Sequence, residues 1–392
     1  MSQLLNERWS ETKEALLEGL SGTRKSSMAV CLENTRKYLA ESASAGATST
    51  GNIATLNRVI LPVIRRVMPT VIANEIVGVQ PMTGPVAQIH TLRVRYADTS
   101  SGDSVVAGDE ALSPFKIAAG YSGNNNATPK AQTTSILEGQ PGKRMSIQIL
   151  KAPVEAKSRK LSARWTFEAA QDAQAMQGID IEAEIMAALA QEITAEIDQE
   201  ILASLRALGT VEQTYDQAAV SGTATFVGDE HAALAVQINR VANLIAQRTR
   251  RGSANWAVIS NQALTILQSA TTSAFARTTE GTFEAPTNTK FVGTLNNSMR
   301  IYVDAYLSDT DDNNQCLIGY KGPSEADAAA FYCPYIPLMS SGVVLDPATF
   351  EPVVGFLTRY GYVELTNTAS SLGNAADYLG KVAITSANVS FR

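Results

Sequence analysis

Residues 180–209 read DIEAEIMAALAQEITAEIDQEILASLRALG and carry the strongest helical pattern of the chain. A branched apolar residue recurs at every fourth position, at Ile181, Ile185, Leu189, Ile193, Ile197, Ile201 and Leu205. A step of four residues advances about 40° around an α-helix, so this stripe winds slowly and contacts different partners along its length. Asp180 suits an N-cap and Gly209 suits a C-terminal stop. The pattern predicts one long helix over residues 180–207.

Two strand patterns precede this helix and flank a long polar stretch. Residues 89–96 alternate apolar and polar side chains, and residues 146–154 form a second strand candidate. Residues 97–145 are rich in Gly, Ser, Asn, Thr and Asp, with isolated apolar residues at Val105, Val106, Leu112 and Phe115. A loop of this length is unusual inside a compact domain. We therefore expect a long two-stranded loop that projects from the body and has no core of its own.

The chain after the long helix alternates helix and strand patterns. An amphipathic helix contains Leu234, Ile238, Val241 and Ile245, and it ends before Gly252. Strand, helix and strand candidates follow at residues 256–259, 263–267 and 299–303, and further strands are expected at residues 331–336 and 353–365. This order predicts a compact α/β unit within an α+β chain.

The N-terminal region changes character abruptly at residue 42. Residues 1–41 contain six acidic and six basic side chains, with an apolar stripe of Leu5, Trp9, Leu16 and Leu20 that Lys13 interrupts. These four apolar residues could form one stripe of a helix, and a helix with so narrow a stripe needs a partner that buries it. Residues 42–55 have no charge and read as an extended arm, and a helix is expected from Leu61 to Met68. The order suits a removable N-terminal segment, and a retained helix is the alternative.

Composition excludes several classes of protein. The chain has 392 residues, 45% hydrophobic and 18% charged, with a formal net charge of −6. This length allows two or three domains, and the acidic balance does not suit general binding to nucleic-acid backbones. No apolar run is long enough to cross a bilayer, and no signal peptide is visible. The three cysteines form no CxxC pair and are expected to be buried thiols.

Motifs for catalysis or metal binding are weak throughout the sequence. His90 and His231 are the only histidines, and neither has a second ligand at a suitable spacing. The segment Gly319–Pro323 places a lysine between glycines but lacks the spacing of a phosphate-binding loop, and no nucleophile elbow is present. Asp309, Asp311 and Asp312 read as a solvated loop. Arg248, Arg250 and Arg251 read as surface charge at a helix end, with an intersubunit ion pair as the alternative. We expect neither an enzyme nor a bound cofactor.

A family resemblance rests on motifs that recur in a fixed order. Together these segments resemble the major head protein family of T-even-like tailed phages over most of residues 60–365. The motifs are Arg65–Pro69, Gly78–Pro85, Ala156–Leu161, Glu168–Asp172, Gly319–Pro323 with Asp327, Tyr332 with Pro334 and Tyr335, Pro352–Phe356, and Thr358–Gly361. The sequence departs from the family at one point, because the interval near residues 97–145 is too short for the inserted domain of T-even head proteins.

The resemblance implies an α+β Hong-Kong-97-type capsid fold. The chain would assemble into hexamers to form a virion shell around double-stranded DNA that it does not bind specifically. Whether the same chain also forms the pentamers is left open by the resemblance. The shell would be assembled in the host cytoplasm, without a membrane. The implied parts are an N-terminal propeptide (1–41), an N-terminal arm (42–60), the peripheral domain (61–96, 146–231 with the spine helix 180–207, and 325–365), the extended loop (97–145), the axial domain (232–324) and a C-terminal segment (366–392).

The resemblance also implies partners and one processing site. A vertex protein, a portal, a scaffold and a head-maturation protease are the expected partners besides the chain itself. Leu39-Ala40-Glu41 before Ser42 fits the preference of such proteases for Leu or Ile, any residue, Glu, then a small residue, so we expect cleavage between Glu41 and Ser42. Glu18 before Gly19 and Glu138 before Gly139 also fit the motif. A pentameric vertex protein and an encapsulin-type cellular shell of the same fold are the rival interpretations.

Overall fold

The structure of the chain is a computed structural model. It describes residues 9, 13, 14, 16, 17, 22, 25–34, 71–100, 105–109, 111, 120–123, 131, 133–139, 142–177, 180–220, 227–270, 275–277, 290–296, 298–307, 314–325, 327–349, 351–365, 375–385 and 389. The predicted helix from Leu61 to Met68, the arm at residues 42–60 and the acidic loop at residues 309–312 lie outside these residues.

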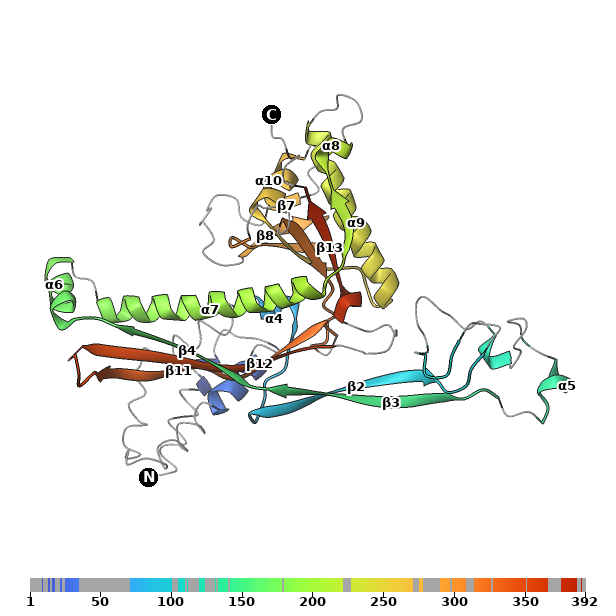
Figure 1. Cartoon of the computed structure of the whole chain (residues 1–392), viewed down its shortest axis with the longest axis horizontal. Coiled ribbons are helices and arrows are strands. Elements are labelled where there is room, and N and C mark those ends of the chain that lie inside the picture. The colour runs from blue at the N-terminus through green and yellow to red at the C-terminus, as the bar shows by residue number, and fades with distance from the viewer. Residues whose placement is uncertain are drawn as a thin grey trace. The chain divides into compact units, whose positions relative to one another are not determined.

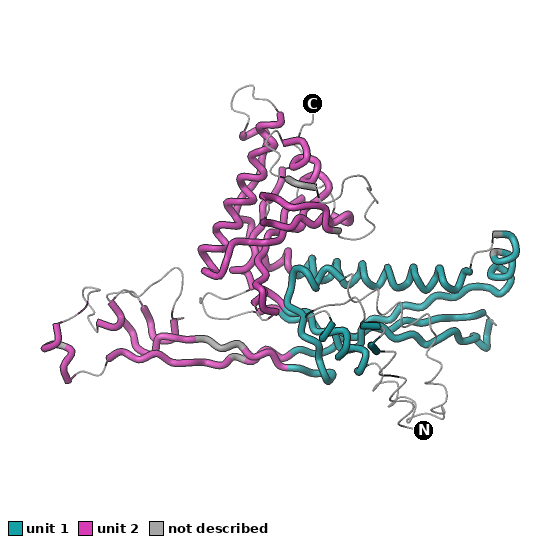
Figure 2. Tube along the Cα trace, turned by 180° about the vertical axis from the view of Figure 1, so that it is seen from behind, with its two compact units in different colours: residues 1–87, 154–204, 331–363 teal, residues 88–153, 205–330, 364–392 magenta. Residues whose placement is uncertain are grey.

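The chain has a mixed α+β fold and divides into two compact units, each assembled from three separate segments (Figure 2). Unit 1 consists of residues 1–87, 154–204 and 331–363. Unit 2 consists of residues 88–153, 205–330 and 364–392. Because the segments interleave, neither unit is a continuous stretch of sequence.

Unit 1 contains a four-stranded sheet in the order β1-β11-β12-β4, with the long helix α7 alongside it (Figure 1). Strand β1 runs parallel to β11, and β12 pairs antiparallel with β4 over eight residue pairs from Val353–Arg164 to Tyr360–Lys157. The bounds are α4 (Ala73–Ile76), β1 (Gly78–Val79), β4 (Lys157–Arg164), α6 (Phe167–Gln177), α7 (Ile181–Leu208), β11 (Ala330–Leu345) and β12 (Pro352–Glu364).

Helix α7 confirms the prediction made from its apolar stripe, with bounds one residue later at each end. Five members of the stripe, from Leu189 to Leu205, are buried, and the first two are partly exposed. Asp180 caps the helix as expected, since its Oδ1 accepts the Glu182 amide at 3.1 Å. The slow winding of the stripe matches a helix whose neighbours change along its length.

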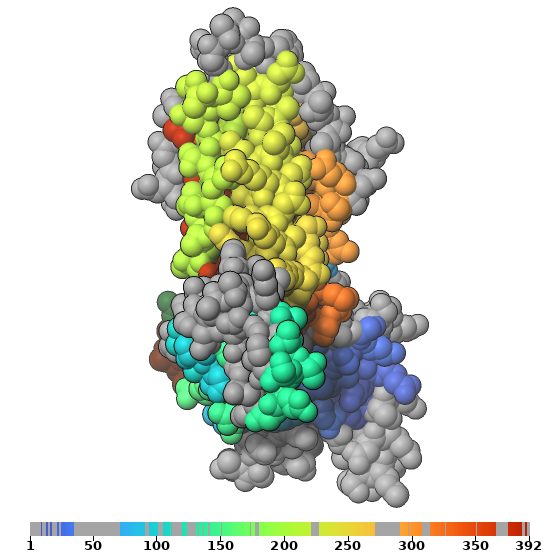
Figure 3. Space-filling model, turned by 90° about the vertical axis from the view of Figure 1, so that its right-hand side faces the viewer, coloured from blue at the N-terminus to red at the C-terminus, as the bar shows by residue number. Residues whose placement is uncertain are grey.

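Unit 2 contains a seven-stranded sheet in the order β5-β13-β10-β6-β9-β8-β7. Helix α9 packs against β13, β10 and β5, and α10 packs against α9. The outward side of α9 forms the yellow surface in Figure 3. The bounds are β5 (Val211–Tyr215), α8 (Gln217–Val220), α9 (Val227–Thr249), β6 (Trp256–Ile259), α10 (Asn261–Ser269), β7 (Phe275–Arg277), β8 (Lys290–Leu295), β9 (Met299–Val303), β10 (Gln315–Gly319), η3 (Ala375–Tyr378) and β13 (Leu379–Ile384).

Two strands of this sheet come from outside residues 232–324, the range expected for this part of the chain. Strand β5 was expected to belong with the long helix, and β13 lies in the segment expected to be a separate C-terminal tail. They pair with each other in parallel, and β13 also pairs antiparallel with β10. An alternating pattern identifies a short strand but not its partner, so neither pairing could be predicted from the sequence.

A two-stranded sheet pairs β2 (Val86–Tyr96) with β3 (Met145–Glu155). These strands confirm the two strand predictions, but they flank residues 97–145 and do not lie within them. The expectation that this loop has no core is also wrong. Tyr96, Val105, Ala111 and Tyr121 form a small buried cluster, with the Tyr96 and Tyr121 ring centroids 4.5 Å apart. Two aromatic rings supply enough apolar area for a minimal core.

Four apolar residues of the loop, Val105, Val106, Leu112 and Phe115, were expected to be buried against a neighbouring subunit. Val105 is buried, whereas Val106 is 58% exposed. Leu112 and Phe115 lie outside the described residues. Two short helical turns also occur in this region, η2 (Tyr121–Gly123) and α5 (Thr134–Leu137). The Asp98 carboxylate accepts the Arg144 amide at 2.7 Å and pairs with its guanidinium at 3.1 Å, which joins the two ends of the loop.

Candidate functional site

A polar cluster joins the sheet of unit 1 to helix α7. The Arg159 guanidinium on β4 donates to Glu196 at 2.8 Å and to Glu200 at 2.7 Å, and both carboxylates lie on α7. Its Nε donates to the Tyr360 hydroxyl on β12 at 2.7 Å, and that hydroxyl donates to Glu200. Glu196 and Glu200 are four residues apart, so they share one face of the helix.

The electrostatics of this cluster favour a structural clamp. Burial opposes ionisation of Glu200, but hydrogen bonds from Tyr360 and Arg159 hold the pKa of its carboxyl below the usual range. Burial, and then the contact with Glu200, raises the pKa of Tyr360. At neutral pH the cluster therefore contains a guanidinium, carboxylates and a neutral phenol, which satisfy one another. It has no activated nucleophile and no poised base.

A buried ion pair lies in unit 2. The Arg206 guanidinium, 16% exposed, pairs with the fully buried Asp304 carboxylate. Asp304 also accepts the Tyr306 amide at 3.0 Å, and Lys381 Nζ donates to the Arg206 carbonyl oxygen at 2.9 Å. A buried charge is tolerated when its partner and its remaining hydrogen bonds are supplied. All of these residues belong to unit 2, which includes the last four residues of α7.

The segment Gly319–Pro323 begins with the last residue of β10 and continues as irregular backbone into a bend at Pro323. The Asn255 side chain makes two hydrogen bonds with the backbone of Lys321. Its Nδ2 donates to the Lys321 carbonyl oxygen at 2.6 Å, and its Oδ1 accepts from the Lys321 amide at 3.0 Å. A Cβ atom on Gly319 would overlap the Trp256 indole, and one on Gly322 would overlap Asp327. The glycines are needed for close packing, and no helix follows to form a phosphate-binding loop.

The basic residues at the end of α9 make contacts within unit 2. Arg248 pairs with Glu212 at 2.6 Å, and Arg251 pairs with Asp327. Asp327 also accepts a hydrogen bond from the Tyr378 hydroxyl at 3.4 Å. Arg248 and Arg251 therefore each have an acidic partner within unit 2.

Other titratable residues give no catalytic arrangement in the described part of the chain. His90 is exposed on β2, while His231 is buried with its Nδ1 2.6 Å from Ser269 Oγ. The three cysteines are buried thiols as predicted, and burial raises the pKa of each thiol to about 12. Within the described residues, no group of three or more His, Cys, Asp or Glu side chains could hold a metal ion. The described helices include none with the length and apolar character to span a membrane.

The ribbon of β2 and β3 carries an exposed apolar row. Met145, Ile147 and Ile149 alternate along β3, so they share one face, and they are 52%, 68% and 60% exposed. Ser146 and Gln148 on the other face are also exposed. An isolated two-stranded ribbon is marginally stable in water, and apolar side chains gathered on one face indicate a contact with another surface.

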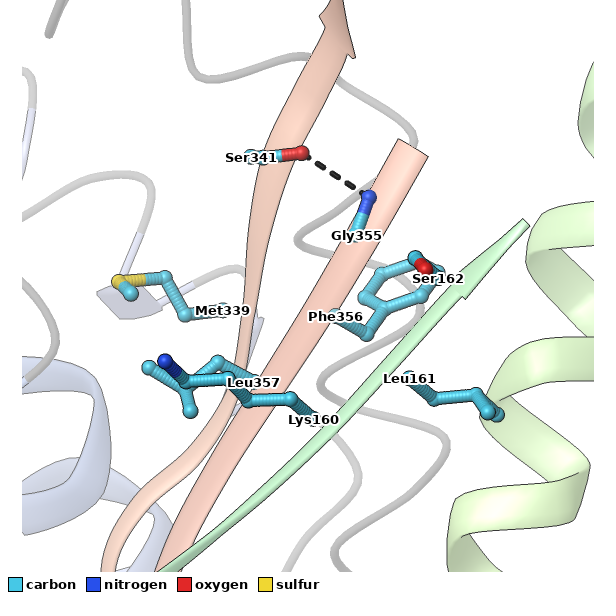
Figure 4. A pocket seen from close by; sticks show the side chains of 8 residues that line it. All are labelled: Lys160, Leu161, Ser162, Met339, Ser341, Gly355, Phe356 and Leu357. Atoms are coloured by element: carbon cyan, nitrogen blue, oxygen red, sulfur yellow. Dashed lines mark hydrogen bonds between the residues drawn. The ribbon is translucent and has the colours of Figure 1, made fainter. Parts of the chain in front are cut away.

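A shallow apolar hollow of about 340 Å³ lies on the sheet of unit 1. Figure 4 shows its lining side chains on three adjacent strands, with the Gly355 amide donating to Ser341 Oγ at 2.9 Å. The hollow exists because Gly355, Ser341 and Ser162 have small side chains. Its lining contains one charged group, and the residues are Lys160, Leu161, Ser162, Met339, Ser341, Gly355, Phe356 and Leu357. This set can hold an apolar side chain but supplies no reaction.

The expected cleavage site, Glu41 and Ser42, lies outside the described residues. The first alternative match places Leu16 and Leu17 in a helical, buried position, whereas Glu18 and Gly19 are not described. The second alternative lies at the end of α5, where Glu138 is exposed and Gly139 has a φ of 79°.

Several solved structures of phage proteins are similar to this chain. One relative of known structure, from Microbacterium phage Oxtober96, matches with a TM-score of 0.47 and 11% identity over 80% of this chain and 90% of that one. The capsid of Myoviridae phage XM1 matches with a TM-score of 0.44 and 9% identity over 79% and 88%.

Comparison of the sequence with known proteins identifies the family of the chain. The chain is 28% identical to the major capsid protein of Vibrio phage KVP40, over 84% of this chain and 80% of that protein. It is 29% identical to the major capsid protein of Enterobacteria phage T4, over 83% and 78%. The sequence pattern of the family described as Major capsid protein Gp23 matches residues 53–384, which is most of the chain. The chain therefore belongs to the Gp23 family of phage major capsid proteins.

Proposed function

We propose that this chain forms hexamers that tile the head of a tailed phage around double-stranded DNA, with the Hong-Kong-97-type arrangement of domains. Membership of the Gp23 family makes the chain a structural protein of the virion capsid, not an enzyme. The chain assembles with itself into the shell. The net charge of −6 supports a wall to which packaged DNA does not adhere.

The observation that carries the assembly proposal is the exposed row of Met145, Ile147 and Ile149 on the ribbon. Removing three large apolar side chains from water supplies a substantial driving force, on the order of 1.5–3 kcal/mol for each when fully buried. A second copy of this chain is the proposed partner, because a shell brings identical surfaces into repeated contact. The ribbon would then lie on a neighbouring subunit.

The proposed domain assignment follows the resemblance and adds two strands to the axial domain. The sheet of unit 1 and α7 correspond to the peripheral domain and spine helix. The seven-stranded sheet corresponds to the axial domain, which then includes β5 and β13. The ribbon with residues 97–144 corresponds to the extended loop, and residues 42–60 to the N-terminal arm.

Processing by a head-maturation protease between Glu41 and Ser42 is part of the proposal. A scaffold, a portal and a vertex protein are the further partners. Intact-mass measurement on protein from mature heads tests the cut. A product that begins at Ser42 supports it, and a mass near the full 41.8 kDa contradicts it.

Electron cryo-microscopy of purified heads, combined with protein quantification, tests the hexamer proposal. We expect this chain to be the most abundant protein of the head and to occupy the six-fold capsomers. Density for this chain only at the five-fold vertices, with a correspondingly low copy number, would assign it to the vertex and contradict the proposal.

A further inference from the structure

The described residues near the N-terminus form two helical runs that pack against each other. Residues 25–34 are helical, and Trp9, Lys13, Glu14, Leu16 and Leu17 belong to an earlier helical run. The Trp9 indole donates to Glu33 Oε2 at 3.3 Å, and Lys13 Nζ lies 3.5 Å from the same oxygen. Trp9 and Lys13 thus contact the last turn of the helix at residues 25–34. We call these residues, 9–34 where described, the N-terminal hairpin.

The second helix of the N-terminal hairpin belongs to the core of unit 1. Met28, Cys31 and Leu32 are each at most 1% exposed. Leu16 and Leu17 from the first run are also buried, at 9% and 7%. Burial of this extent is typical of a structural element and not of a segment that rests loosely on a surface.

Asn34 attaches the N-terminal hairpin to the polypeptide backbone of the sheet. Its Nδ2, in a side chain that is only 5% exposed overall, donates to the Met82 carbonyl oxygen at 2.7 Å and to the Tyr335 carbonyl oxygen at 3.2 Å. These carbonyls lie where the chain leaves β1 beside β11, since the Met82 amide donates to the Pro334 carbonyl at 3.0 Å. Loss of Asn34 would leave both carbonyl oxygens without this donor, which is unfavourable in a buried place.

We propose that the N-terminal hairpin is a noncovalently held part of unit 1, so that a cut between Glu41 and Ser42 leaves it bound and release needs a separate displacement step. The proposal rests on the proposed processing only for the position of the cut. That position is seven residues beyond Asn34, and all the contacts above precede it. Cutting the chain there breaks none of them.

Cleavage of the chain and departure of residues 1–41 are then two separate steps with different causes. Hydrolysis of one peptide bond makes the departure of residues 1–41 possible but does not drive it. Departure exposes Met28, Cys31 and Leu32 to water together with the sheet surface that they cover. Only an event that deforms this edge of unit 1, or a competitor for the same surface, removes the N-terminal hairpin.

The test uses the full chain with a recognition sequence for a site-specific protease inserted between Glu41 and Ser42. After digestion, size-exclusion chromatography with mass spectrometry follows residues 1–41. We expect this fragment to elute with the rest of the chain. A fragment that separates from a body with an unchanged circular dichroism spectrum overturns the proposal.

Two variants show whether burial causes the retention. Leu32→Glu places a charge in the buried helix and should weaken retention by roughly 100-fold or more. Lys25→Glu alters an exposed position of the same helix and should leave retention unchanged. Equal retention of the Leu32→Glu and Lys25→Glu fragments, as trapping inside a closed particle would give, overturns the proposal.

A milder variant covers the case in which Leu32→Glu does not fold. Asn34→Ala removes only the two hydrogen bonds and should speed release of the fragment about tenfold. An unchanged release rate contradicts the assigned role of Asn34. The engineered site separates this test from the native processing: an uncut chain in mature heads refutes cleavage after Glu41 and leaves the retention result standing.

Discussion

Arg159 on β4 donates from Nε to the Tyr360 hydroxyl on β12 at 2.7 Å, and both side chains contact Glu200 of α7. The two residues therefore join adjacent strands to the long helix through one carboxylate. Tyr360→Phe keeps the buried ring and removes only the hydroxyl. We expect the free energy of unfolding to fall by about 1 kcal/mol, because Glu200 and Arg159 regain water as a partner. Chemical denaturation measures the change, and Ser158→Ala at the exposed neighbouring position is the matched control.

The same cluster predicts a dependence of stability on pH. The pKa of Glu200 is lower in the folded chain than its ordinary value of 4.5, so the unfolded chain binds more protons near that pH. Stability from this group is present above about pH 4.5 and is lost as the pH falls through the lowered pKa. Glu200 is 43% exposed, and solvent screening keeps the contribution below about 1 kcal/mol.

Glu200→Gln removes this titration. We expect the variant to lose less stability than the original chain between neutral and acidic pH, measured by denaturation at a series of pH values. Parallel curves for the two proteins across the acidic range would show that Glu200 is not stabilised in its charged form.

Local patterns in the sequence identified elements better than they identified partners. Strands β6 and β9 occur with the predicted bounds, and α7 follows its stripe. The parallel pairing of β5 with β13 was missed. It joins residues 211–215 to residues near the end of the sequence, and the hydrophobic periodicity of a single strand does not identify a partner so distant in the sequence.

The polar cluster and the N-terminal hairpin were missed for a related reason. Glu196 and Glu200, four residues apart, indicate that a basic side chain could bind to one face of α7. The sequence does not show that this side chain is Arg159. Lys13 seemed to interrupt an apolar stripe, whereas it pairs with Glu33 across the N-terminal hairpin. A charged residue within a stripe is compatible with burial when its partner comes from another helix.

Packing at Gly319, the last residue of β10, predicts a strict requirement for glycine at this position. Gly319→Ala would push a methyl group into the Trp256 indole, and overpacking of this kind costs about 1–3 kcal/mol. Gly142→Ala is the control, since no heavy atom lies within 4 Å of the added Cβ. Thermal unfolding and Trp fluorescence should change for Gly319→Ala alone. Equal melting temperatures for the two variants would contradict the packing described here.

The buried stripe of α7 predicts a severe defect for Ile193→Asp. Ile193 is 1% exposed, and an unpaired carboxylate at this position costs several kcal/mol, on the order of 4 or more. We expect insoluble protein after expression. Gln191→Glu, at an exposed position two residues earlier, should remain soluble. Soluble Ile193→Asp with a native circular dichroism spectrum would show that the stripe is not part of the core.

Assembly of ribbon variants tests the central claim most directly, namely that the exposed row on β3 joins this chain to a second copy. Ile147→Asp alters the centre of the row, which is 68% exposed in the single chain and should tolerate the change in folding. Gln148→Glu adds a charge on the opposite face of the same strand. Electron microscopy and sedimentation velocity on the purified proteins measure shell formation. The account predicts folded Ile147→Asp subunits that do not form shells, beside Gln148→Glu subunits that do; normal shells from Ile147→Asp would contradict it.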